Sequence, residues 1–329
     1  MKVRALEIFV ENMPEMMTRL SCGACWRKDK SFDYASRTCP VKRSLKRIDL
    51  QMPSKLKVQN NIEEFRRIAK NLVTRIATYK GVAGIVLLGG LVRGFVDKWS
   101  DLDITVFLSK RDERLRKQII KTGSNTQKRF KIDIDLEVHS LEDFKKRQWS
   151  ETDKWDLSNS KIVFDPEGKI KELFRQKLRS PKKVWTRRIA VRAEYLKWYC
   201  CPPKDSIGSI AETWVDRGDL LAAHYCLNYA VDLLTEMIFA LNKEHLPPPK
   251  WRVFYSYRLR WLPESYDALI AEGMKAKRSS LRDINRRLRA IRETWRQILP
   301  KLEKETGMTQ DQLSKYYVTE ILGQTCFKD

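Results

Sequence analysis

The pattern of apolar and polar residues predicts a small β-sheet in the first half of the chain. Residues 81–88 are apolar and rich in β-branched side chains, which is typical of a buried strand. Further strands are expected over 103–108, 131–138 and 161–168. Strict alternation in the third of these places its apolar residues on one face and its acidic residues on the other.

Apolar residues recur at helical spacing between and around these strands. Helices are therefore expected over 60–80, 111–129, 141–147 and 169–178. The second helix is expected to break at Gly123-Ser124-Asn125.

From residue 182 onward the chain reads as helical. Residues 218–241 are apolar almost all round, as expected of the central helix of a bundle. Residues 279–299 have one apolar face and one face rich in arginine. The order of elements predicts an α+β protein with a sheet domain over 60–180 and an all-α helical bundle over 181–329.

The most informative chemistry lies between the first two strands. Gly89 and Gly90 end the first strand in a turn, where backbone amides can approach a phosphate closely. Asp101 and Asp103 flank one residue at the start of the second strand, so the period of two points both carboxylates to one face. Carboxylates that lie side by side repel each other, and such pairs usually hold a hard cation such as Mg²⁺.

A third carboxylate is expected from the strand over 131–138. Asp133, Asp135 and Glu137 share one face of it, and three acids in a row require water or a cation opposite them. We rank Asp135 first, because a central position best meets Asp101 and Asp103 on a neighbouring strand. Asp133 and Glu137 remain alternatives.

The stretch 87–106, with its glycine turn and aspartate pair, resembles the active-site signature of the nucleotidyltransferase superfamily, which includes DNA polymerase β and the antibiotic nucleotidyltransferases. The family pattern is a strand, Gly-Gly or Gly-Ser, a spacer, and then Asp-hydrophobic-Asp. The spacing of Gly90, Arg93 and Gly94, with Ser100 before the aspartates, is similar to the minimal and antibiotic-type branch. The glycines fit neither a P-loop nor the Rossmann fingerprint.

The resemblance implies a mixed sheet of about five strands and a helical domain that closes over the cleft. It also implies Mg²⁺ held by Asp101, Asp103 and Asp135, and transfer of a nucleoside monophosphate from a nucleoside triphosphate, ATP or CTP. Gly89, Gly90, Ser100 and Arg93 would bind the phosphates. Arg93 could instead be a structural partner within the loop.

Charge changes the expected partner. The chain has 65 lysines and arginines against 42 acidic residues, a net charge of +23. Such a field attracts polyanions, so we expect an RNA acceptor, with tRNA as the first candidate; solubility or a heat-adapted surface is the alternative explanation. Candidate contacts are the basic and aromatic segment 182–199, Lys250-Trp251-Arg252, and the arginines Arg286, Arg289 and Arg292.

Three other functions remain open at this stage. An antibiotic-type adenylyltransferase fits the family branch, although cationic aminoglycosides usually require an acidic pocket. A protein AMPylating enzyme would use the same nucleotide chemistry. A non-catalytic nucleic-acid binding module is disfavoured by the intact carboxylates.

Residues 1–59 form a basic leader that contains Cys22, Cys25 and Cys39. Cys22-Gly23-Ala24-Cys25 places two thiolates on one turn, which is typical of half a zinc or iron–sulfur site. Cys200, Cys201 or Cys326 could supply a fourth ligand; unligated cysteines or a redox pair are the alternative. The leader has no secretory signal and the chain no transmembrane run, so we expect a cytoplasmic protein.

Overall fold

The computed structural model describes residues 58–203, 206–277 and 280–323. The leader with Cys22, Cys25 and Cys39 therefore lies outside the described residues, as does Cys326. Within the described ranges, every helix is too short or too polar to span a bilayer.

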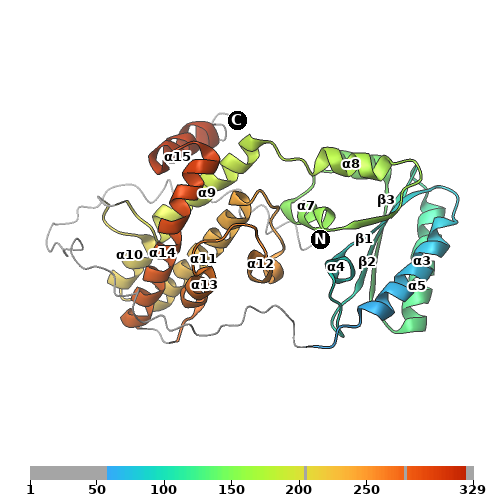
Figure 1. Cartoon of the computed structure of the whole chain (residues 1–329), viewed down its shortest axis with the longest axis horizontal. Coiled ribbons are helices and arrows are strands. Elements are labelled where there is room, and N and C mark those ends of the chain that lie inside the picture. Colours follow the sequence, from blue (N-terminus) through green and yellow to red (C-terminus); the bar gives the residue numbers. More distant parts are fainter. Residues whose placement is uncertain (1–57, 204–205, 278–279, 324–329) are drawn as a thin grey trace. The chain divides into compact units, whose positions relative to one another are not determined.

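A four-stranded mixed sheet forms the first part of the fold (Figure 1). The strand order is β3-β2-β1-β4, with β1 antiparallel to both β2 and β4 and β2 parallel to β3. The strands are β1 (Val82–Leu87), β2 (Leu102–Leu108), β3 (Ile134–Ser140) and β4 (Lys161–Phe164). The expected mixed sheet is confirmed, and in the described residues it has four strands rather than about five.

Helices α3 (Ile62–Ala77) and α5 (Glu113–Phe130) cover one face of the sheet (Figure 1). Their apolar stripes pack on alternate residues of β2, including Leu102 and Ile104. The expected break in α5 is wrong, because the helix runs on through Gly123. A Cβ atom there would lie 2.6 Å from the Leu136 side chain, so the glycine lets α5 approach β3 closely.

The other face of the sheet packs on α6 (Leu141–Lys146), α7 (Glu151–Ser158) and α8 (Lys169–Lys177). Helix α7 was not predicted from the sequence. It begins at a capping box, in which Ser150 accepts a hydrogen bond from the Asp153 amide and Asp153 accepts one from the Ser150 amide. It buries only Trp155 and Leu157, and so it lacks the repeated apolar stripe that identifies a helix in a sequence.

The C-terminal part is helical, as expected. Its core gathers apolar side chains around α11 (Leu220–Leu241), which is buried over most of its length. The surrounding elements are α9 (Lys182–Tyr199), α10 (Ile210–Asp216), α12 (Pro249–Ser256), α13 (Tyr266–Met274), α14 (Leu281–Thr306), α15 (Gln310–Tyr316) and the π-helical turn η2 (Tyr317–Leu322). The division of the chain into 1–59, 60–180 and 181–329 stays a prediction.

The arginines of α14 do not form the free basic face that the sequence suggests. Arg287 is fully buried and donates to the Gly273 carbonyl and Asn228. Arg286 pairs with Glu272 and Asp283, and Arg292 pairs with Glu212. Three of the six arginines of α14 therefore hold the helix against its neighbours, while Arg282, Arg289 and Arg296 are exposed.

Candidate active site

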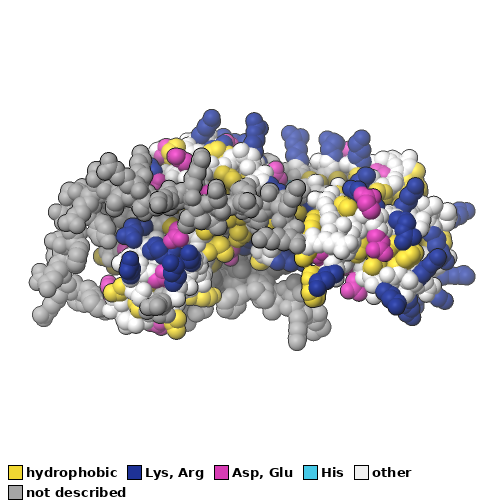
Figure 2. Space-filling model, turned by 60° about the horizontal axis from the view of Figure 1, so that its bottom comes forward, with side chains coloured by type: hydrophobic (Ala, Val, Ile, Leu, Met, Phe, Trp, Pro, Cys, Tyr) yellow, Lys and Arg dark blue, Asp and Glu magenta, His cyan; other side chains and the backbone are white. Residues whose placement is uncertain are grey.

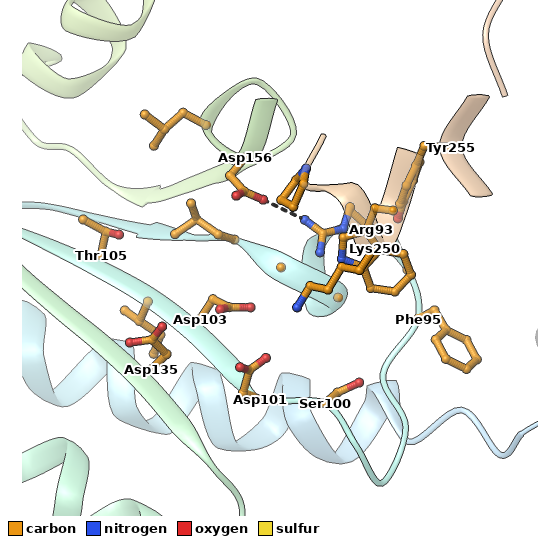
Figure 3. A pocket seen from close by; sticks show the side chains of 18 of the residues that line it. Arg93, Phe95, Ser100, Asp101, Asp103, Thr105, Asp135, Asp156, Lys250 and Tyr255 are labelled. Carbon is orange, nitrogen blue, oxygen red and sulfur yellow. Dashed lines mark hydrogen bonds and ion pairs between the residues drawn. The ribbon is translucent and has the colours of Figure 1, made fainter. Parts of the chain in front are cut away.

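A cavity of about 870 Å³ opens between the sheet and α12. The glycine turn, the loop that precedes β2, strands β2 and β3, and residues of α7 and α12 contribute to it (Figure 3). All seven residues that the sequence assigns to catalysis or nucleotide binding line this one cavity: Gly89, Gly90, Arg93, Ser100, Asp101, Asp103 and Asp135.

The glycine turn lies directly against a carboxylate. Gly89 begins the short helix α4 (Gly89–Arg93) at φ +66°, in the left-handed region. A Cβ atom at Gly89 would lie 1.6 Å from Oδ2 of Asp103. At Gly90 it would lie 2.5 Å from the Phe95 carbonyl oxygen. Both positions therefore require glycine, and the Asp103 carboxylate occupies the space that the missing side chain leaves.

Parallel pairing of β2 and β3 brings the carboxylates together. Asp103 and Asp135 are direct register partners, and Asp101 lies immediately before β2 (Figure 3). Burial, followed by the charges of Asp101 and Asp135, raises the pKa of Asp103 to about 6. Burial, Glu137 and Asp101 also raise the pKa of Asp135. This mutual repulsion is what a bound cation would relieve.

The three candidates for the third carboxylate lie in different surroundings. Asp133 precedes β3 and is not among the cavity-lining residues. Glu137 lines the cavity, but its Oε2 lies 2.9 Å from Nε2 of His139, and this hydrogen bond is the main reason that the pKa of Glu137 is lowered. Asp135 lies opposite Asp103, and no hydrogen bond or ion pair of its side chain is seen within the described part of the chain. This geometry favours Asp135.

The donor set suits Mg²⁺ in part. Among the described residues, no group of three or more histidine, cysteine, aspartate or glutamate side chains forms a ready-made metal site. Magnesium seldom uses an all-protein cage, because it is normally held by one or two carboxylates together with water and substrate phosphates. The side chains of Asp101, Asp103 and Asp135 lie beside an open cavity without an ion-pair partner in the described residues, so they fit that mode of binding.

Ser100 lines the cavity but already has a partner. Its hydroxyl accepts a hydrogen bond from the Asp97 amide and donates one to Asp97 Oδ1, both at 3.0 Å. The Trp99 amide donates to the same carboxylate. Ser100 therefore fixes the loop that leads into Asp101, and a phosphate contact by Ser100 stays a prediction.

Arg93 has the most elaborate surroundings in the cavity. Its side chain is only 10% exposed and donates from Nη1 to Asp156 Oδ1 of α7, at 3.2 Å. The guanidinium carbon lies 4.8 Å from the ring centroid of Trp155, and it lies within 6 Å of the rings of Trp251 and Tyr255 on α12. We call Trp155, Trp251 and Tyr255 the aromatic cage. The Arg93 Nε is buried without a partner.

The segment Lys250-Trp251-Arg252 divides between two roles. Figure 3 shows the Lys250 side chain extending from α12 into the cavity, toward Asp101 and Asp103. Trp251 belongs to the aromatic cage. Arg252 points elsewhere and pairs with Glu236 at 2.7 Å and Asp232 at 3.6 Å.

Sequence reasoning missed Asp156, Trp155 and Tyr255. In the sequence, Trp155 stands next to Asp156, and Tyr255 follows the proline run 247–249. Neither pattern reveals a contact with Arg93.

Trp185 is buried in the helical core rather than available to a base, whereas Trp198 on the same helix is 40% exposed. Cys200, Cys201 and Cys226 are buried free thiols.

Comparison with known proteins identifies the sheet part of the chain. Residues 62–159 match the family model described as a nucleotidyltransferase domain. Residues 149–252 match a second family model, described as a domain of unknown function (DUF4037). No curated protein matches the sequence.

Solved structures resemble the chain only distantly. A nucleotidyltransferase-like protein from Exiguobacterium sibiricum 255-15 is 12% identical over 73% of this chain and 77% of its own, with a TM-score of 0.35. Spectinomycin adenyltransferase AAD(9) from Enterococcus faecialis, solved with ATP and spectinomycin, is 11% identical over 73% of this chain and 99% of its own, with a TM-score of 0.28. A mutant of the toxin–antitoxin MntA-HpeT is 15% identical over 41% of this chain and 98% of its own, with a TM-score of 0.26.

These TM-scores are too low to support an argument, and the assignment therefore rests on the family match. That match covers α3 to α7, which include the glycine turn, Asp101, Asp103 and Asp135. Residues 62–159 belong to the nucleotidyltransferase domain family, and the protein is a nucleotidyltransferase.

Proposed function

We propose that the protein transfers a nucleoside monophosphate from a nucleoside triphosphate to RNA in a Mg²⁺-dependent reaction, with this cavity as its active site. The observation that carries this proposal is the convergence of Asp101, Asp103 and Asp135 beside the Gly89 turn, inside the segment that matches the nucleotidyltransferase family. ATP or CTP is the expected nucleotide, and a cytoplasmic location is the expected setting.

Each residue has a distinct part in this reaction. Backbone amides at Gly89 and Gly90 would hold the β- and γ-phosphates, and Lys250 would approach them from α12. Asp101, Asp103 and Asp135 would hold Mg²⁺. When bound, this ion would polarise the α-phosphate and lower the pKa of the acceptor hydroxyl. Asp135 would receive the proton of that hydroxyl.

The bond changes follow from in-line displacement. The acceptor oxygen attacks the α-phosphorus, and the bond from that phosphorus to the oxygen bridging to the β-phosphate breaks. Pyrophosphate leaves with the bonding electrons, and the acceptor gains a phosphodiester to the nucleoside. The glycine turn and the carboxylates serve this step by positioning both oxygens in line.

One observation favours a cationic small molecule as a second candidate acceptor. More acidic than basic residues line the cavity, in a chain that is otherwise strongly basic. The acidic residues are Asp97, Asp101, Asp103, Asp135, Glu137, Asp153 and Asp156; the basic ones are Arg93, Arg147, Lys250 and Arg258.

An acceptor screen tests the proposal. The full chain is incubated with Mg²⁺ and each α-labelled nucleoside triphosphate in turn, together with total RNA, a protein extract or a panel of aminoglycosides. We expect label on RNA from one nucleotide. Label confined to aminoglycosides would support the second candidate, and label on protein would identify an AMPylating enzyme.

A further inference from the structure

An exposed tryptophan stands at the edge of the cavity, in the loop between Gly94 and Asp101. Trp99 is 82% exposed, and its amide is fixed by the Asp97 carboxylate at 2.9 Å. The Lys98 ammonium lies 4.8 Å from the Trp99 ring centroid. A large ring held out in solvent next to a cation, on an ordered turn, presents a free face for stacking.

A second group of the same kind lies on α12 and the turn after it. Phe254, Tyr255 and Arg258 all line the cavity. The Arg258 guanidinium carbon lies 4.8 Å from the Phe254 ring and 5.1 Å from the Tyr255 ring. Arg258 is exposed and has no carboxylate partner within the described part of the chain. Two elements far apart in the sequence thus bring rings with attached cations to one cavity.

The size of the cavity limits how much of a long acceptor it can hold. A volume of about 870 Å³ is near the upper end of the roughly 300–1,000 Å³ of clefts that hold one small ligand. A nucleoside triphosphate and the reacting end of an acceptor would fill it. The remainder of a long acceptor would therefore have to cross the edge of the cavity, where Trp99 and Arg258 lie.

The acidic residues in the cavity are mostly engaged, which weakens the case for a cationic acceptor. Asp156 pairs with Arg93, and Asp153 caps α7 and pairs with Arg147. Asp97 binds Ser100, and Glu137 binds His139. The remaining acids are the three carboxylates assigned to the metal.

We propose that Lys98 with Trp99, and Phe254 with Tyr255 and Arg258, bind the single-stranded end of an RNA acceptor. Bases would stack on the rings and phosphates would contact the cations, which is the usual recognition of single-stranded nucleic acid. Paired bases in a duplex have both faces covered by their neighbours, so they cannot use the rings in this way. This inference rests on the proposed function and specifies where its acceptor binds.

Direct binding tests the proposal without requiring transfer. A fluorescent single-stranded RNA of about ten nucleotides is titrated with the full chain, by anisotropy, without Mg²⁺ or nucleotide. We expect Trp99→Ala to weaken binding about 5- to 100-fold, since one stacked base is lost. Arg258→Glu should weaken it by about tenfold and reduce the dependence on salt.

Two matched controls make the result specific. Tyr225→Ala removes a solvent-exposed aromatic ring from α11, and Arg260→Glu reverses an exposed arginine two residues from Arg258; neither residue lines the cavity. Both should leave RNA affinity within about twofold, and a blunt-ended RNA duplex of the same length should bind more weakly than the single strand.

The proposal would be overturned if Trp99→Ala and Arg258→Glu bound RNA as tightly as the wild type. Loss of binding on reversal of Lys117 and Lys121, exposed on α5, with no loss in the cavity variants, would place the RNA on another face. Binding of Mg²⁺ and nucleotide, followed by thermal shift, reports on the proposed function separately. If Trp99→Ala loses affinity for RNA but still binds nucleotide, the acceptor assignment stands. If both variants keep the affinity for RNA and the wild type binds no nucleotide, each proposal is contradicted by its own measurement.

Discussion

Gly89 and Asp103 form a single feature, because each determines what the other can be. The chain turns at φ +66° to enter α4, and the carboxylate of Asp103 lies where a side chain at position 89 would be. The turn that is expected to hold phosphates is thereby placed against the carboxylate that is expected to hold the metal. Substitutions at the two positions should therefore affect the same step.

A single methyl group tests this coupling. Gly89→Ala must push the Asp103 carboxylate away, and a displacement of about 1 Å in an active site can cost about 100-fold in rate. We expect Gly89→Ala to lower kcat/KM for nucleotide transfer by at least that factor. Gly168→Ala is the matched control, because Gly168 has φ +69° and open space around it. It should cost about 1 kcal/mol of stability and leave the rate unchanged; equal activity of the two variants would contradict the account.

The raised pKa of Asp103 predicts a dependence of stability on pH. Folding lifts this pKa from 3.8 to about 6, so the folded protein binds the proton more tightly than the unfolded chain does. The resulting destabilisation is absent below about pH 4, grows as the pH rises to 6, and is complete above it. In EDTA at pH 7.5, Asp103→Asn should raise the Tm by about 2–4 °C.

At pH 4 the two proteins should melt together. Addition of Mg²⁺ and nucleotide should stabilise the wild type more than Asp103→Asn, while transfer by the variant falls by about 10²-fold or more. An Asp103→Asn protein that melts below the wild type at pH 7.5 in EDTA would show that the ionised carboxylate stabilises the fold instead.

At the scale of elements, local patterns predicted most of the sheet domain. The apolar runs located β1 and β2, and the alternation in 131–138 placed Asp135 on one face with Glu137. A period of two is a local property, so the face of each carboxylate could be inferred. That Asp103 lies opposite Asp135 depends on parallel pairing of two separate strands, which the family resemblance supplied.

Contacts between distant segments could not be predicted in this way. Asp156 and Arg93 are 63 residues apart, and the helix that carries Asp156 has too few buried residues to show a periodic pattern. Arg286 and Arg292 of α14 resembled part of a free basic face because their acidic partners, Glu272 and Glu212, come from α13 and α10. The helix that carries these arginines was correctly predicted, but their ion pairs with other helices make them structural rather than free to contact RNA.

The Arg93–Asp156 pair connects α4 with α7, inside the aromatic cage. Asp156→Asn should leave a nearly buried guanidinium without its charged partner, which costs about 1–3 kcal/mol. Arg93→Lys should also impair nucleotide binding, because an ammonium cannot stack on the aromatic cage or keep the same hydrogen bond to Asp156. We expect both variants to raise the KM for nucleotide, measured alongside the Tm. A wild-type KM in Arg93→Lys would mean that only charge is needed there.

The contacts of α14 predict that charge reversal there destabilises the fold. Arg292 donates to Glu212 at 2.7 Å and to the Cys200 carbonyl at 2.8 Å. Arg292→Glu places two carboxylates together and should cost about 3 kcal/mol or more, by urea denaturation. Arg289→Glu, at an exposed position on the same helix, should change stability by less than about 0.5 kcal/mol. Equal stability of the two variants would show that the Arg292 contacts contribute little.

At the scale of the whole molecule, α5 carries a cluster of exposed cations within the described part of the chain. Figure 2 shows lysine and arginine side chains gathered over the end of the molecule where α3 and α5 lie. The exposed cations of α5 are Arg114, Arg116, Lys117, Lys121, Lys128 and Arg129. Asp103 and Asp135 lie on the cavity side of the sheet, whereas these helices cover its other face. This charge would therefore attract RNA over long range without positioning it for reaction.

The most direct test of the central claim follows the two ends of the triphosphate separately. The full chain is incubated with Mg²⁺, total RNA and the active nucleotide, labelled on either the α- or the γ-phosphate. We predict that α-label joins RNA in equal amount to the pyrophosphate that carries the γ-label. EDTA should abolish both products, and Asp103→Asn should lower both by about 100-fold or more. Transfer of γ-label to the acceptor, or undiminished transfer by Asp103→Asn, would contradict the account.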